Sequence, residues 1–146
     1  MAFAMRMTFV DVICDDSLKH VYVDGEKAGF QFEARLAYYR GHYLSAIDEF
    51  YVTVDGVKYD PAVCTFGING KTLNGAMLNR YASEFWTLLE PAKIAVFVPG
   101  GIPEGEHEID LHLMLRVPYL PLPGGDNDHA YMPIDSCGQK TLTIHD

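Results

Sequence analysis

The sequence has little positive charge and no long apolar run. It contains 11 Lys and Arg against 20 Asp and Glu in 146 residues, a formal net charge of −9. Nucleic acids and anionic membrane surfaces are bound by concentrated Lys and Arg, so this balance argues against both as partners. No apolar stretch approaches the roughly 20 residues of a membrane-spanning helix, and residues 1–7 lack the pattern of a signal peptide. We therefore expect a cytoplasmic protein.

Cysteine is scarce as well. The three cysteines, Cys14, Cys64 and Cys137, are widely spaced, so they form neither a disulfide framework nor a CxxC metal pair. We interpret them as buried thiols in a reducing compartment.

The six histidines do not form a recognisable metal-binding pattern. His107 and His112 are five positions apart, which places them on opposite faces of a strand. His129 lies near Asp126 and Asp128 and could form an oxygen–nitrogen site, but such a loop is more often a solvated turn. We expect no metal and no cofactor on this chain.

A period of two dominates what is present. Apolar residues occupy alternate positions in three segments: Phe30, Phe32, Ala34, Leu36 and Tyr38; Phe50, Val52 and Val54; and Ile109, Leu111, Leu113 and Leu115. This alternation is typical of antiparallel sheets with one buried and one wet face.

Turn residues separate these segments. Asp24-Gly25, Asp55-Gly56 and Asn69-Gly70 each lie between apolar stretches, and such pairs supply the positive φ of tight hairpins. Eight or nine short strands at this spacing predict an all-β fold, an antiparallel, jelly-roll-like β-sandwich, with residues 1–146 as a single domain.

Two segments depart from the alternation. Residues 74–89 have apolar residues at a more helical spacing, so we predict one short helix there, ended by Pro91. Residues 118–133 contain four prolines, which predicts an ordered loop or an edge rather than a central strand. Residues 140–145 are expected to form the last strand.

Aromatic and basic residues gather where predicted strands end. Tyrosine offers an apolar face and a hydroxyl, and arginine a planar fork of donors, so together they suit a ring-shaped polar ligand or a partner's rim. The alternative is an ordinary strand end, with Arg40 paired to a surface carboxylate. The candidate substrate or partner contacts are Tyr38, Arg40, His42, Tyr43, Trp86, Arg116, Pro118, Tyr119 and Pro121.

No catalytic residue is predicted. In Asp135-Ser136-Cys137-Gly138, no histidine is fixed beside the nucleophiles by local spacing, so a structural turn capped by Asp135 is the better interpretation. The carboxylates Glu106, Glu108 and Asp110 share one face and are most simply a solvated stripe.

An ordered set of short motifs resembles a known family, the small β subunit of bacterial C-glycoside deglycosidases. The resemblance spans roughly residues 10–144. The motifs are Gly29-Phe30-Gln31-Phe32, Tyr38-Tyr39-Arg40-Gly41-His42-Tyr43-Leu44-Ser45, Val54-Asp55-Gly56, Phe66-Gly67-Ile68-Asn69-Gly70, Glu84-Phe85-Trp86, Pro99-Gly100-Gly101, Gly105-Glu106-His107, Arg116-Val117-Pro118-Tyr119 and Asp135-Ser136-Cys137-Gly138.

The resemblance implies a function shared between subunits. In that family, a larger α subunit resembling an isomerase barrel holds a divalent metal, Mn or Mg, and the small subunit is a β-sandwich bound to it. The hetero-oligomer of α–β pairs cleaves the C–C bond between a 3-oxo-glucosyl group and an aromatic aglycone, such as a flavonoid or anthraquinone. The small-molecule C-glycoside would then bind at the complex, with the base on the α subunit.

Two other functions stay open. A stand-alone carbohydrate-binding module would stack sugar rings on exposed tyrosine or tryptophan, although the single Trp86 lies in the predicted helix. A self-sufficient hydrolase or isomerase would need converging histidine and carboxylate side chains that the sequence does not show.

Overall fold

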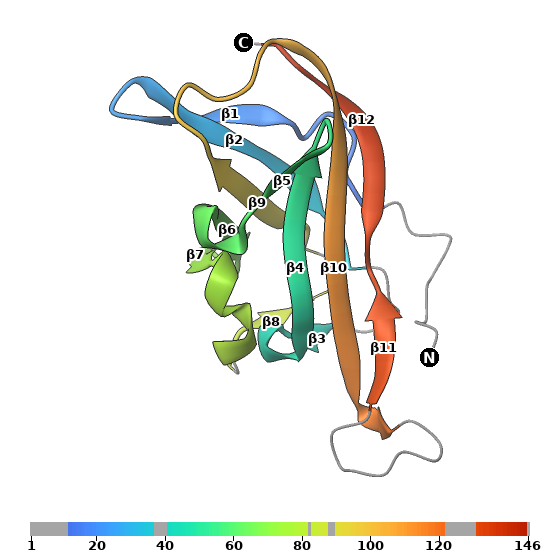
Figure 1. The fold of residues 1–146 in the computed structure, drawn as a ribbon. Coiled ribbons are helices and arrows are strands. Elements are labelled where there is room, and N and C mark those ends of the chain that lie inside the picture. The colour runs from blue at the N-terminus through green and yellow to red at the C-terminus, as the bar shows by residue number, and fades with distance from the viewer. Residues whose placement is uncertain (1–11, 37–40, 82, 88–89, 122–130, 146) are drawn as a thin grey trace.

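Two antiparallel sheets pack face to face in the computed structural model, which describes residues 12–36, 41–81, 83–87, 90–121 and 131–145 (Figure 1). One sheet has the order β1-β2-β9-β6-β7, and the other β11-β10-β4-β5, with β12 also paired to β10; β3 and β8 form a small ribbon. The strands are β1 (Lys19–Val23), β2 (Glu26–Ala34), β3 (His42–Tyr43), β4 (Ile47–Val54), β5 (Val57–Tyr59), β6 (Cys64–Ile68), β7 (Lys71–Asn74), β8 (Phe85–Trp86), β9 (Ala92–Phe97), β10 (Gly105–Pro121), β11 (Tyr131–Asp135) and β12 (Gly138–Ile144). The predicted antiparallel β-sandwich is confirmed.

The helical content of the described residues is limited to three 3₁₀ helices: η1 (Leu44–Ala46), η2 (Pro61–Val63) and η3 (Gly75–Arg80). The helix predicted over 74–89 is therefore correct only in its first part, because Phe85 and Trp86 form strand β8. Their backbones pair with β3, and the Trp86 side chain enters the core. Among all the residues that the structure describes, no helix is long and apolar enough to span a membrane.

The proline-rich region contains more strand than the sequence predicts. β10 continues to Pro121, and β11 begins at Tyr131. Pairing of β10 with β4 ends at Leu115, and the register with β11 shifts between Arg116 and Pro121. Pro118, Pro121 and Pro133 thus fall where ladder hydrogen bonds are interrupted or at a sheet edge, as their missing N–H requires. Residues 122–130 lie outside the described part.

The core lies between the two sheets and follows the predicted alternation. Phe30, Phe32, Ala34 and Leu36 are buried on one side, and the alternate residues of β4 and β10 on the other. Phe50 and Phe66 meet edge-to-face across the interior, with ring centroids 5.9 Å apart. Tyr38 of the predicted alternation lies outside the described residues.

The predicted hairpin turns are also confirmed. Both residues of each turn have positive φ: 53° and 83° at Asp24-Gly25, 50° and 83° at Asp55-Gly56, and 54° and 72° at Asn69-Gly70. This is the type I′ conformation, which matches the twist of the flanking strands.

Gly29 lies where β2 and β9 approach closely, since an added Cβ would be 2.0 Å from the carbonyl oxygen of Val96. We expect Gly29→Ala to lower the free energy of unfolding by about 1–3 kcal/mol or more, because backbone must move. Gly67→Ala is the control, because its Cβ would have no neighbour closer than the Lys93 Cβ at 3.3 Å. Urea unfolding measures both; equal losses would contradict this account of the packing.

An ion pair ties the β4–β5 turn to β10. His107 is buried, and its ring contacts the Asp55 carboxylate through Nδ1 (2.5 Å) and the Pro103 carbonyl through Nε2 (2.6 Å). Burial alone would lower the pKa of His107, but the bonds to Asp55 and Pro103 outweigh it and raise that pKa. The Asp55 pKa is lowered, first by the backbone N–H of Glu108 and then by His107.

These shifts give a stability window. The contribution of Asp55 is lost as the pH falls through its lowered pKa, and that of His107 is lost as the pH rises through its raised pKa. The pair therefore stabilises the fold most between the ordinary values of 3.8 and 6.5. We expect Asp55→Asn to flatten the loss of stability above this window, measured by urea unfolding across pH. Asp24→Asn, in the equivalent β1–β2 turn, is the control; identical profiles for both variants would contradict the assignment.

Candidate functional site

Two exposed rings lie at one end of the sandwich, on the short β3–β8 ribbon. Tyr43 and Phe85 are cross-strand partners, 50% and 39% exposed, with centroids 4.9 Å apart and an edge-to-face angle of 74°. We call them the aromatic pair. Gly41 permits this arrangement, because an added Cβ would lie 2.5 Å from the Trp86 carbonyl oxygen and 2.6 Å from the Phe85 ring.

The other two predicted contacts on this ribbon face inward. Trp86 is 0% exposed, donates its indole N–H to the Glu90 carbonyl (2.8 Å) and meets Phe66 edge-to-face at 5.2 Å. His42 is 4% exposed. Both side chains therefore support the ribbon from the core, and the ribbon's accessible surface comes from the aromatic pair.

Arg116 is brought to the same end of the molecule. Its guanidinium donates to the Asp48 carboxylate and to the Ser45 carbonyl (2.9 Å), and Ser45 lies in η1 directly after β3. Arg116 thus forms the carboxylate pairing that the sequence suggests as the ordinary role of arginine at a strand end. A hollow of about 310 Å³ next to Asp48 is lined by β4, η2 and η3.

The remaining predicted contacts are located only in part. Tyr38 and Arg40 lie outside the described residues. Pro118, Tyr119 and Pro121 belong to the end of β10, and only their backbone is described. Their roles stay predictions.

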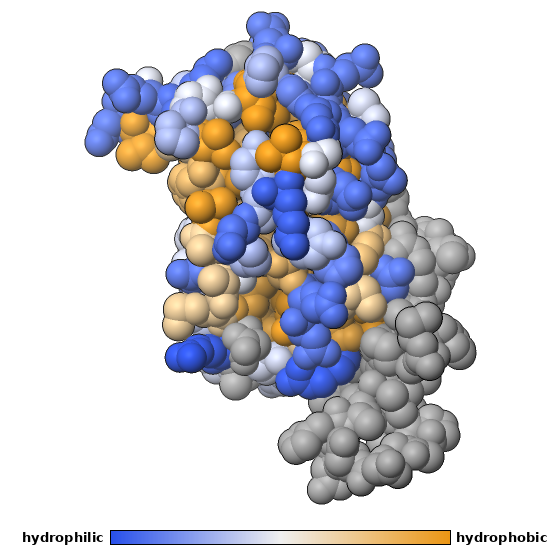
Figure 2. All heavy atoms as spheres, viewed as in Figure 1, coloured by the Kyte–Doolittle hydropathy of each residue, from blue (hydrophilic) through white to orange (hydrophobic). Residues whose placement is uncertain are grey.

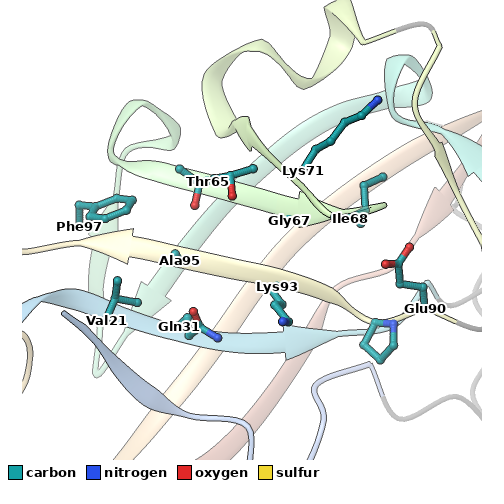
Figure 3. A pocket seen from close by; sticks show the side chains of 13 residues that line it. Val21, Gln31, Thr65, Gly67, Ile68, Lys71, Glu90, Lys93, Ala95 and Phe97 are labelled. Carbon is teal, nitrogen blue, oxygen red and sulfur yellow. The ribbon is translucent and has the colours of Figure 1, made fainter. Parts of the chain in front are cut away.

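A groove of about 350 Å³ lies on the outer face of the β1-β2-β9-β6-β7 sheet (Figure 3). Gly67 and Ala95 are small residues on adjacent strands and leave the space open, while Gln31, Lys93 and Phe97 contribute longer side chains around it. Phe97 is 39% exposed. An amide, an ammonium group and an aromatic ring around one hollow can hold a polar, ring-shaped ligand or a partner's side chain.

The groove and the aromatic pair are connected through one turn. Asn69 and Gly70 form the β6–β7 turn, and Gly70 lines the groove. The Asn69 side chain donates to the Phe85 carbonyl (3.1 Å), and its backbone N–H donates to the Glu90 carboxylate (3.1 and 3.2 Å). The β6–β7 turn therefore links the edge of the groove to strand β8.

Sequence reasoning missed the groove. Most of its residues lie on the five strands of one sheet, and their meeting depends on strand order, which the sequence does not specify. One sequence feature could have indicated the groove. Gly67 is a glycine inside a predicted strand, and such a glycine often marks a site where a ligand or another backbone approaches the strand closely.

Two further observations concern titratable side chains. The Asp135 carboxylate accepts the Cys137 backbone N–H (2.9 Å), so the predicted capped turn is confirmed. Within the described ranges, no group of three or more His, Cys, Asp or Glu side chains is arranged to hold a metal ion. On the face seen in Figure 2, apolar residues are interspersed with hydrophilic ones.

The packed sheets, the groove and the aromatic pair define an all-β sandwich with a hollow on one sheet and exposed rings at one end. The chain belongs to the C-glycoside deglycosidase beta subunit family, whose model matches residues 9–119. The matched segment contains the groove and the aromatic pair. The resemblance read from the motifs is thereby confirmed.

Three similar proteins support the same family. A C-glycoside deglycosidase beta subunit of Eubacterium cellulosolvens is 34% identical over 98 residues, 67% of each chain. A 3'-dehydrocarminate deglycosidase beta subunit of a Microbacterium species is 34% identical over 114 residues, 77% of this chain and 81% of the relative. A C-glycoside deglycosidase beta subunit of Arthrobacter globiformis is 27% identical over 136 residues, 91% of this chain and 98% of the relative.

Proposed function

We propose that this chain is the β subunit of a C-glycoside deglycosidase and works as a complex with a larger, barrel-shaped α subunit. The complex cleaves the C–C bond between a 3-oxo-glucosyl group and an aromatic aglycone. The observation that carries this proposal is the family match over residues 9–119, together with relatives named as beta subunits of deglycosidases. The relative named for 3'-dehydrocarminate favours a substrate oxidised on its sugar.

The proposal divides the chemistry between the subunits. A 3-keto group acidifies the neighbouring C2 proton, and a base on the α subunit removes it to start an elimination that expels the aglycone. The divalent metal, Mn or Mg, belongs to the α subunit. This chain supplies a docking surface and contacts at the mouth of the active site.

The aromatic pair is the best-supported docking element. Tyrosine and phenylalanine are enriched at interface centres because they bury large areas with little loss of side-chain freedom. Tyr43 and Phe85 are exposed yet rigidly supported by the buried Trp86 and by the Asn69 bond to Phe85. Arg116, held by Asp48 and Ser45, adds a fixed cation nearby.

The function is tested by measuring deglycosylation of a 3-oxo-C-glucoside in three samples: this chain alone, a candidate α subunit alone, and the two co-expressed with manganese. We expect turnover and co-elution only for the co-expressed pair. Turnover by this chain alone would contradict the assignment of the catalytic base and the metal to the α subunit. Binding of free sugar by the chain alone, without co-elution, would favour the carbohydrate-binding module, with the groove as its site.

The docking surface is tested by replacing the aromatic pair. We expect Tyr43→Ala with Phe85→Ala to weaken the α–β complex by about tenfold or more, because truncating central aromatic contacts typically costs 2 kcal/mol or more. Tyr22→Ala is the matched control: Tyr22 is 48% exposed, close to the 50% of Tyr43, but lies on β1. Affinity is measured by titrating immobilised α subunit. If the control weakened the complex as much as the double replacement, the aromatic pair would not be part of the interface.

A further inference from the structure

Cys137 occupies a break between two strands that share one edge of β10. β12 pairs with β10 from Gly105 to Leu111, and β11 pairs with it from Met114 onward. Between them, the Leu113 carbonyl accepts the Ser136 N–H (2.9 Å), while the Leu113 N–H points at Cys137 Sγ (3.5 Å). The sulfur thus takes the place of a backbone acceptor and is held on the sheet.

A histidine lies next to this thiol, and a carboxylate lies next to the histidine. Cys137 Sγ lies 3.7 Å from His112 Nδ1, and His112 Nε2 lies 2.7 Å from Glu49 Oε1. An ionised carboxylate only accepts hydrogen bonds, so Nε2 carries a proton. In the neutral ring, Nδ1 is then an acceptor directed at the thiol. Cys137 is thus placed as a nucleophile, His112 as its base and Glu49 as the carboxylate that orients the base.

The imidazole is held rigidly and remains accessible. The ring of Tyr51, the cross-strand partner of His112, stacks on it with centroids 4.4 Å apart and an angle of 13°. The Lys58 ammonium lies 4.1 Å from the centroid of Tyr51. The side chains of His112 and Glu49 are 27% and 62% exposed, and Cys137 is partly exposed.

The other two thiols provide an internal contrast. Cys14 and Cys64 are buried in the core, 6% and 2% exposed. Burial, followed by the nearby Asp60 carboxylate, raises the pKa of Cys64 to about 12. The environment of Cys64 thus disfavours the thiolate form, which is the nucleophilic one, and the burial of Cys14 limits its access to reagents.

We propose that Cys137, His112 and Glu49 form a nucleophilic site that adds to α,β-unsaturated carbonyl compounds. His112 takes the thiol proton, and the thiolate forms a C–S bond to the β-carbon. The C=C π pair forms a new double bond between the α-carbon and the carbonyl carbon, and the C=O π pair moves to the oxygen, which gives an enolate. The imidazolium then returns the proton to the α-carbon. The net reaction adds S–H across the double bond, so it requires no oxidant or reductant.

The surroundings favour this reaction over acyl transfer. Acyl transfer needs backbone donors aimed at a developing oxyanion. The Leu113 N–H is directed at the sulfur itself, and the Cys137 N–H is donated to Asp135. Conjugate addition needs only a base that becomes an acid, which His112 provides.

The test uses the full chain treated with cyclohexenone near neutral pH, followed by intact-mass analysis and peptide mapping. We expect one adduct, on Cys137, with Cys14 and Cys64 unmodified. His112→Gln should slow adduct formation by about tenfold or more, as for loss of a general base. Asp110→Asn, which removes a carboxylate from the same outer face of β10, is the control and should leave the rate unchanged. Circular dichroism verifies the fold of each variant.

Glu49 is a positioning residue, so its test includes a spectroscopic readout. In ¹⁵N NMR of the His112 ring, we expect the Nε2–H tautomer in the parent chain and a shift towards the other tautomer in Glu49→Gln. A Cys137 no more reactive than glutathione, or an unchanged rate in His112→Gln, would overturn the proposal. Because the assay requires neither a partner nor deglycosidase activity, its failure would leave the proposed function untouched.

Discussion

The period-two alternation of β10 is the constraint on which the rest of the structure depends. Its inward residues Ile109, Leu111, Leu113 and Leu115 are at most 1% exposed and form one wall of the core. Its outward residues include His112 and Arg116. A slip of one residue would exchange the two sets. The pairing of β10 with β4 therefore determines the core and both polar arrangements on its outer face at once.

Local sequence features predicted much of this scaffold. The three turns need positive φ at two consecutive residues, which few pairs other than Asp-Gly and Asn-Gly tolerate well, so the hairpins could be located directly. Alternation then assigned the buried face of each strand. The strong steric preference of the turns and the cost of exposing an apolar face make these features readable from short segments.

Features that depend on distant pairing could not be predicted in the same way. The apolar spacing around Phe85 and Trp86 fits a helix as well as a strand, and the pairing with β3, some 43 positions away, decides the outcome. The contact of Cys137 with His112 spans 25 positions, and that of His112 with Glu49 spans 63. These contacts follow from strand register and from the β11–β12 break, neither of which has a local signature.

The groove with the aromatic pair and the thiol site differ in how they lie relative to the residues that the family model matches. The groove, the aromatic pair, His112 and Glu49 lie within the matched residues 9–119, whereas Cys137 lies beyond them. The thiol therefore lies outside the residues matched by the family model, although Asp135-Ser136-Cys137-Gly138 is among the motifs through which the sequence resembles the family. The groove lies on the outer face of one sheet and the thiol site on the outer face of the other. A partner bound over the groove alone would leave the opposite sheet accessible. A partner that docks on the aromatic pair and reaches Arg116 would approach the thiol site, because Arg116 and His112 share the outer face of β10.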